Sequence, residues 1–181
     1  PLVVGFVVLL AFFLMVAAFR SLAVPLTAVA VNLLSVCASY GVVKWIFQDG
    51  HLAKQLGFHS YGGVVAWLPL FMFVILFGLS MDYHVFVLSR IRELRLRGVP
   101  TKQAVIGGIG SSSGVVSSAA LIMVAVFSLF AFMPFAPMKM IGIGMASAIA
   151  IDATLVRGVL VPAIMSLLGE RNWSLPRALR W

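Results

Sequence analysis

Long apolar stretches separated by short polar breaks dominate the chain. The stretches fall at residues 1–19, 22–47, 64–88, 104–133 and 138–168. A hydrocarbon core about 30 Å thick needs about 20 apolar residues per helix, so each stretch is long enough to cross it with some tilt. Because lipid offers the backbone no hydrogen-bond partner, the crossing segments must be helices. The pattern predicts an all-α membrane protein, a bundle of five transmembrane helices at 1–168, followed by a tail at 169–181.

Composition and charge agree with this interpretation. Of all residues, 62% are hydrophobic and only 10% are charged, against about 25% charged in a soluble domain, which excludes a soluble globule. A net charge of +8 would suit nucleic-acid binding only if the cations formed a solvated patch. Here the cations lie mostly in the breaks between apolar stretches. We therefore expect membrane lipids, and no nucleic acid, as partners. The lone cysteine, Cys37, lies in an apolar run and offers neither a disulfide framework nor a metal site.

The distribution of lysine and arginine predicts the orientation. If the five stretches cross in alternation, nine basic residues lie on one side and three on the other, and cytoplasmic loops carry the excess. The nine are Arg20, Arg90, Arg92, Arg95, Arg97, Lys102, Arg171, Arg177 and Arg180, and the three are Lys44, Lys54 and Lys139. We therefore expect the N-terminus outside and the C-terminus, with the tail, in the cytoplasm. A chain that begins outside, directly in a span and without a charged leader, is expected to be a fragment of a larger protein.

One acidic residue, Asp82, stands deep in the third span. It lies eight residues before Arg90, about 12 Å from the boundary at 1.5 Å rise per residue. An ionisable residue at that depth costs at least ~2.5 kcal/mol, so pairing, water or function must justify it. Gly78 and Ser89 share its helical face and indicate a helix contact rather than lipid. A carboxyl group in hydrocarbon favours its protonated form and is able to exchange a proton near neutral pH, which favours a proton-relay role over a structural one.

The two residues after Asp82 are also polar. Tyr83 points about 100° away on the same helix, so adjacent side chains meet different neighbours. For Tyr83, a relay role and packing with a satisfied hydroxyl are equally open. His84 has no second metal ligand one turn away, and we interpret it as a packing or hydrogen-bonding residue with proton transfer as the alternative.

The fifth span carries an acid and a base, Asp152 and Arg157. Five residues of α-helix separate the two side chains by about 140°, so they are not expected to pair within one helix, and each should find a partner on another helix. For Asp152, proton or gating chemistry and a structural role are both open. For Arg157, we favour a structural counter-charge.

Small residues recur at four-residue intervals in spans four and five, a pattern typical of close helix packing. With Gly78 of span three and the neighbouring polar residues of span four, the predicted helix-packing and polar residues are Gly78, Ser111, Ser113, Gly114, Ser118, Gly142, Thr154 and Gly158. Residues 110–114 also satisfy G-x-S-x-G, which would make Ser112 a nucleophile with His84 as its base. That motif requires a strand–turn–helix elbow, so we keep an intramembrane serine hydrolase only as a distant alternative and expect no catalytic residue.

Several motifs together resemble the MMPL family of the RND transporter superfamily. They are FGLSMDY at 77–83, SRIRE at 89–93, DATLVR at 152–157, VPA at 161–163, NW at 172–173, and RSL at 20–22 with Pro25. The resemblance covers nearly the whole chain. It implies a protein of twelve helices with exported porter domains, of which this chain corresponds to the last five helices. The N-terminal transmembrane half and both porter domains would then be missing partners.

The resemblance also implies a function. Members of this family export lipids and other hydrophobic molecules across the cell membrane, the inner membrane of bacteria, using protons as the coupling ion and no cofactor. It implies that Asp82 and Tyr83 match the acid and tyrosine of the proton relay. The family has Glu after this pair, where this chain has His84. The alternative is a non-transporting lipid-binding or sensing module of the sterol-sensing kind, which needs packing faces but no titrating acid.

Overall fold

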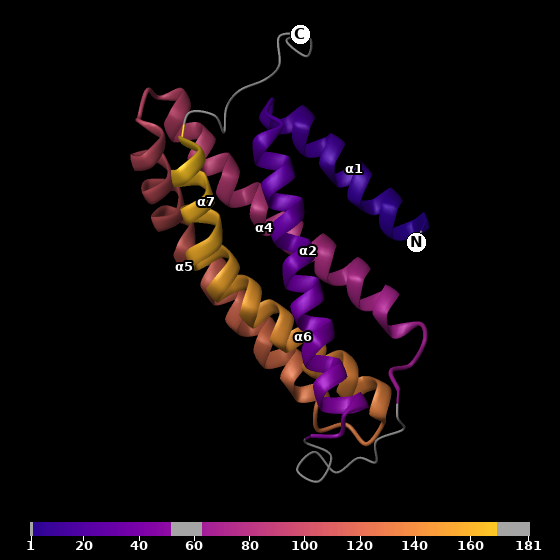
Figure 1. The fold of residues 1–181 in the computed structure, drawn as a ribbon. Coiled ribbons are helices and arrows are strands. Elements are labelled where there is room, and N and C mark those ends of the chain that lie inside the picture. Colours follow the sequence, from indigo (N-terminus) through magenta and orange to yellow (C-terminus); the bar gives the residue numbers. More distant parts are fainter. Residues whose placement is uncertain (1, 52–62, 170–181) are drawn as a thin grey trace.

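The structure, a computed structural model, describes residues 2–51 and 63–169. The predicted tail beyond Gly169, together with Lys54, lies outside the described residues. Figure 1 shows a bundle of long helices and, in the described part, no strand. Its elements are α1 (Leu2–Phe19), α2 (Ala23–Val43) with its π-helical continuation η1 (Lys44–Gln48), α4 (Leu68–Leu96), α5 (Thr101–Phe130), and α6 (Ala136–Ile151) continued by the π-helix η2 (Asp152–Leu160) and α7 (Val161–Leu168).

Five of these helices are long and apolar enough to cross a membrane, counting α2 with η1 and α6 with η2 and α7 as one each. The predicted all-α membrane fold is therefore confirmed. Helix α2 packs against α1, α4 and α6, while α5 packs against α4 and α6. Helix α1 lies at the edge of the bundle (Figure 1) and buries only Met15 and Phe19.

The third helix is displaced relative to the stretch at 64–88. It begins at Leu68, with proline in its first turn, where the missing N–H costs nothing. It then continues beyond the apolar stretch to Leu96, because charged side chains support its last turns. Glu93 accepts hydrogen bonds from Arg90 at 2.9 Å and from Arg97 at 2.7 Å, at spacings that stabilise an exposed helix.

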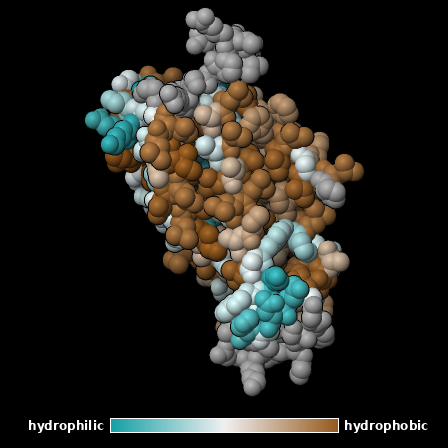
Figure 2. Space-filling model, viewed as in Figure 1, coloured by the Kyte–Doolittle hydropathy of each residue, from teal (hydrophilic) through white to brown (hydrophobic). Residues whose placement is uncertain are grey.

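The surface matches the expected environment. Figure 2 shows hydrophobic side chains covering the middle of the molecule and hydrophilic ones gathered at its two ends. Large apolar side chains are exposed on α1 and α5, among them Phe6, Phe13, Leu121 and Leu129. In water such a surface would be unstable, whereas in hydrocarbon it is the surface a spanning bundle requires.

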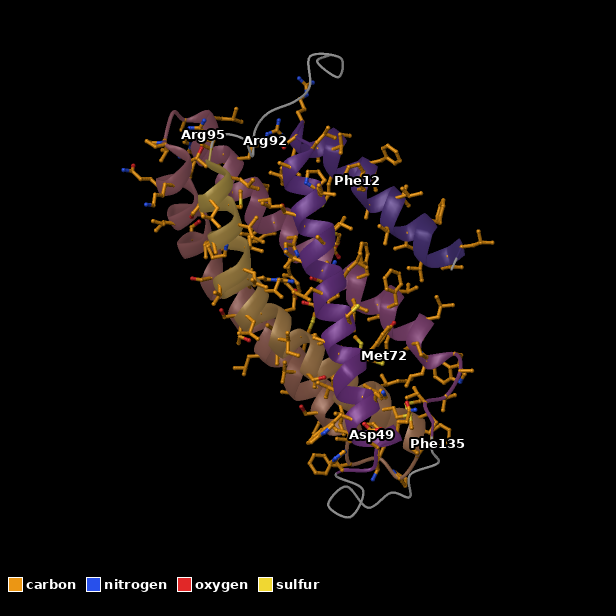
Figure 3. The ribbon with its side chains drawn as sticks, viewed as in Figure 1. Phe12, Asp49, Met72, Arg92, Arg95 and Phe135 are labelled. Atoms are coloured by element: carbon orange, nitrogen blue, oxygen red, sulfur yellow. The ribbon has the colours of Figure 1, made fainter. Side chains whose placement is uncertain are left out.

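Two ends of the bundle define the expected membrane boundaries. Arg92 and Arg95 lie at one end, and Asp49 and Phe135 at the other (Figure 3). In a Cys37→Ala background, we predict that a cysteine at Asp49 reacts with an impermeant thiol reagent added outside, and that one at Gln103 reacts only after the membrane is opened. Reaction of both from one side would contradict the five-span arrangement, and the reverse pattern would contradict the orientation.

Close helix approach depends on a few glycines. A Cβ on Gly108 would lie 2.9 Å from the backbone nitrogen of Ile91, and one on Gly142 would lie 2.6 Å from the carbonyl oxygen of Phe127. Side chains can move away from such a clash, but the backbone of a packed neighbour cannot. These glycines therefore set the α4–α5 and α5–α6 separations.

We predict that Gly108→Ala lowers the midpoint of thermal unfolding in lipid nanodiscs, because overpacking by about 1–3 kcal/mol exceeds the helix propensity gained. Gly41→Ala is the matched control, since a Cβ there meets no atom within 4 Å. The control should leave the midpoint unchanged or raise it. An equal response of the two variants would contradict the packing described here.

Candidate functional site

A buried polar cluster lies where α2, α4 and η2 meet. At its centre is the carboxylate of Asp152, whose residue is 6% exposed. The hydroxyl of Ser35 in α2 donates to one oxygen at 3.2 Å, and the hydroxyl of Ser80 in α4 donates to the other at 2.9 Å. The guanidinium of Arg157 donates to this second oxygen and forms an ion pair with it. Three elements thus converge on one carboxylate.

The pairing of Asp152 with Arg157 corrects the sequence prediction, which did not expect the two to pair within one helix. The two residues are five apart, and that spacing would separate them on an α-helix. They lie instead at the start and middle of η2, a nine-residue π-helix. Its i→i+5 hydrogen bonds bring residues five apart onto about the same face. Local π-helical geometry therefore creates the ion pair.

Arg157 links the acid to helix α4. Its Nη2 also donates to the carbonyl and hydroxyl oxygens of Ser80, at 3.3 and 3.4 Å. Its guanidinium carbon lies 4.7 Å from the centre of the Tyr83 ring, within range of a cation–π interaction. A charge inside an apolar bundle is tolerable only when it is paired and hydrogen-bonded, and Arg157 is both.

Asp82 and Tyr83 face different ways. Asp82 is exposed on the outside of the bundle, and within residues 2–51 and 63–169 its carboxylate has no ion pair or side-chain hydrogen bond. Gly78, one turn earlier, is exposed on the same side, and a Cβ there would meet nothing within 4 Å. Tyr83 is half-buried, and its hydroxyl lies 3.8 Å from the sulfur of Met123. The structure thus places Tyr83, not Asp82, beside the Asp152 cluster.

His84 is 2% exposed and has two distinct ring nitrogens. Its Nδ1 lies 2.9 Å from the carbonyl oxygen of Ser80 and 3.4 Å from the hydroxyl of the same residue. A carbonyl oxygen only accepts, so Nδ1 carries the hydrogen and Nε2 of the neutral ring is an acceptor. Within the described part of the chain, this buried Nε2 has no hydrogen-bond partner.

Two cavities flank the cluster. The first, of ≈ 20 Å³, lies between α2, α4 and η2 and is lined by Asn32, Ser35, Tyr83 and Asp152. That volume holds about one water molecule. The second, of ≈ 110 Å³, lies between α4, α5 and η2. We call it the His84 cavity, and its polar lining residues are His84, Ser112, Ser113, Ser117 and Arg157.

The predicted packing face of span five holds only in part. Gly142 is buried against α5, but Thr154 and Gly158 are exposed. The π-helix changes the register after Asp152, so the four-residue spacing no longer follows one face. Gly144, which the prediction omitted, is close-packed as well, since a Cβ there would lie 2.8 Å from a methyl carbon of Val43.

The predicted packing residues of span four point away from the bundle. Ser111, Ser113, Gly114 and Ser118 are exposed, and Gly114 would meet nothing within 4 Å if it carried a Cβ. Residues 110–114 lie inside helix α5 rather than at an elbow. The hydroxyl of Ser112 donates to the carbonyl of Gly108. This geometry argues against the hydrolase alternative.

Sequence reasoning missed three members of the polar cluster, namely Ser35, Ser80 and Asn32. Asn32 is fully buried, and its amide donates to the carbonyl of Phe77 at 3.2 Å. Asn32, Ser35 and Ser39 recur at helical spacing in span two, and all three are buried. This polar stripe could have predicted that the same face of span two points into the bundle.

The fold and the cluster define a class of protein: a polytopic helical membrane protein with a buried, hydrogen-bonded ion pair between its helices. The family model of the MMPL family matches residues 2–181. The chain belongs to the MMPL family, as its motifs indicated.

Individual relatives are similar along the whole chain. It is 44% identical over 177 residues to the mycolic acid-containing lipids exporter MmpL11 of Mycolicibacterium smegmatis and to the heme uptake protein MmpL11 of Mycobacterium tuberculosis, covering 98% of this chain and 18% of each relative. It is 37% identical over 177 residues to the trehalose monomycolate exporter MmpL3 of Mycobacterium tuberculosis, covering 98% of this chain and 19% of that protein. The chain thus spans about a fifth of the length of these relatives.

Proposed function

We propose that this chain is the C-terminal membrane part of a proton-driven exporter of lipids or other hydrophobic molecules. Asp82 is its relay carboxylate and Tyr83 its partner in the relay. Exporters of lipids among the similar proteins support the class of cargo. The name of one equally similar protein refers to heme uptake. The proposal therefore extends to hydrophobic molecules in general and does not select one cargo.

The exposed position of Asp82 is the observation that carries this proposal. An intramembrane carboxylate almost always faces a bundle interior, a partner or water. Asp82 lies near the middle of the 29-residue helix α4, on the face that points out of the bundle. Gly78, one turn earlier on this face, is also exposed and has no atom packed against it. A helix from a further membrane part, packed on this face, would place Asp82 at an interface between two halves. The protonation of an acid at that interface would depend on the arrangement of both halves.

The mechanism follows from a change of charge at this interface. When Asp82 takes up a proton from one side of the membrane, its charge-assisted hydrogen bonds weaken. The balance between two arrangements of the halves then shifts, since a proton biases whichever arrangement binds it more tightly. Rocking of one half against the other is the usual form of such a change in secondary transporters.

Tyr83 connects the interface to the ion pair. Its ring contacts the Arg157 guanidinium, and Asp82 is the residue directly before it in α4. A displacement of this turn of α4 therefore moves both the exposed acid and the aromatic face over the buried cation. The two charged sites are coupled through one helix segment.

The proposal is tested in cells that lack the gene and are complemented with it. We expect cells without the protein to retain a lipid that complemented cells place on their surface, measured by extraction and chromatography of surface lipid. Collapse of the proton gradient at constant ATP should stop export in complemented cells within minutes. Normal lipid export after that collapse would contradict a proton-driven exporter.

A further inference from the structure

His84 stands between a cavity and the buried acid. One nitrogen, Nε2, is an unpartnered acceptor on a residue that lines the His84 cavity. The other, Nδ1, lies 3.4 Å from the hydroxyl of Ser80, and that hydroxyl donates to Asp152 at 2.9 Å. A chain of titratable and hydroxyl groups thus runs from the cavity to the carboxylate through Ser80.

The His84 cavity has the properties of a hydrated space. Its volume of ≈ 110 Å³ is enough for about three water molecules, since each takes up about 30 Å³ in the liquid. A buried water also needs two to four polar partners, and the residues that line this cavity include His84, three serines and Arg157. The buried Nε2 of His84 and Nε of Arg157 have no partner within the described residues. Water in the cavity would satisfy such groups, whereas an empty cavity leaves them unpaired.

We propose that the His84 cavity is a water-filled proton-binding site and that His84 passes protons between this water and Asp152. This inference rests on the proposed proton-driven function and deepens it. It adds a second proton site that is complete within this chain, besides Asp82, which needs a partner from outside it.

The transfer balances atom by atom. A hydronium ion in the cavity gives its proton to Nε2 of His84, and the imidazolium passes the Nδ1 proton to the oxygen of Ser80. Ser80 in turn gives its own hydroxyl proton to Asp152. The products are a water molecule, a neutral His84 protonated on Nε2, an unchanged serine and a neutral Asp152. Release of the proton from Asp152 runs the same steps in reverse and restores the starting tautomer.

The groups that face His84 define its charge environment. From η2 these are Asp152, within reach through Ser80, and Arg157, which lines the same cavity. Among the residues that line the two cavities bordered by His84, the polar side chains of α5 are serines and that of α2 is Thr27, so neither helix adds a charged group there. The nearest titratable neighbour on α4 is Tyr83, whose ring lies over Arg157. A proton on His84 is thus repelled by one cation and attracted by one carboxylate.

Transfer to Asp152 has a mechanical consequence. Once Asp152 is neutral, the positive charge of Arg157 has lost its counter-ion in an apolar bundle. The ion pair exists only in the π-helical geometry of η2, so neutralising the acid removes a contact that favours that geometry. A proton delivered by His84 therefore destabilises η2, the segment that connects α6 to α7.

The experiment is a pH jump on the natural protein in lipid, followed by time-resolved infrared spectroscopy. The carboxyl band of Asp152 is identified by its loss in Asp152→Asn. We expect the imidazole bands to change before this carboxyl band rises. In His84→Gln and Ser80→Ala the carboxyl band should rise about 100-fold more slowly, the low end of what a positioned acid–base group contributes. His51→Gln is the matched control and should match wild type, because His51 is an exposed histidine stacked on Trp45.

The variants differ in a way that separates transfer from structure. Ser80→Ala keeps the Nδ1 bond to the Ser80 carbonyl, so the imidazole bands should still respond while the carboxyl band lags. A carboxyl band that rises at the wild-type rate in either variant would overturn the proposal. So would a wild-type carboxyl band that rises with unchanged imidazole bands, a result that requires no variant to fold. Asp82→Asn should leave these rates unchanged, so failure of the export proposal is seen separately.

Discussion

Replacing Asp82 with asparagine is expected to abolish export while leaving the amount of protein in the membrane nearly normal. The amide has the shape of the carboxyl group but does not titrate, so only proton coupling is lost. The Asp82 carboxylate forms no ion pair or side-chain hydrogen bond within the described residues, and the substitution therefore removes no polar contact inside this bundle. The measurement is surface lipid in complemented cells, normalised to protein by immunoblot.

Two comparisons make this result specific. Asp49→Asn removes an exposed acid at the end of η1 and should not affect export. Asp152→Asn should reduce export less than Asp82→Asn, because Asp152 is buried inside this bundle and not at the proposed interface between the halves. Undiminished export by Asp82→Asn at normal protein level would exclude Asp82 as the relay and favour the sensing module.

The second large effect is expected from Arg157→Met, through stability rather than transport. The substitution leaves the Asp152 carboxylate buried with only two serine hydroxyls. Removing one partner of a buried ion pair costs about 3–5 kcal/mol, because the other charge is left uncompensated. The unfolding midpoint in nanodiscs should fall accordingly.

A double-mutant cycle separates the pair from its surroundings. Asp152→Asn combined with Arg157→Met should be clearly more stable than the single Arg157→Met variant, because the double variant buries no lone charge. Strictly additive effects would show that the two side chains do not interact. That outcome would contradict the π-helical geometry of η2.

Sequence patterns predicted the helices well because the bilayer imposes a single rule. Residues 2–19 are apolar throughout and residues 104–133 carry no charged side chain, and in lipid a single spanning segment satisfies its backbone hydrogen bonds only as a helix. The boundaries were less predictable, as at Leu96, where interactions of Glu93 with two arginines extend the helix beyond its apolar part. Hydropathy does not register such ion pairs.

The site was predicted residue by residue but not in its geometry. Motif positions indicated Asp82, Asp152 and Arg157. The prediction that Asp152 and Arg157 would not pair was wrong, because it placed both side chains at α-helical angles. No residue preference in 152–160 indicates a π-helix, so the sequence alone did not predict that Asp152 and Arg157 lie on about the same face. The same change of register carried Thr154 and Gly158 out of the predicted packing face.

Proton flux measured with the reconstituted natural protein tests the central claim most directly. Vesicles containing a pH-sensitive dye would be given an acid pulse with and without the lipid extract that the protein moves in cells. The proposed mechanism predicts proton entry that depends on this lipid in wild type and falls to the level of empty vesicles in Asp82→Asn. Lipid-dependent entry that persists in Asp82→Asn, or lipid movement by wild type without proton entry, would contradict it.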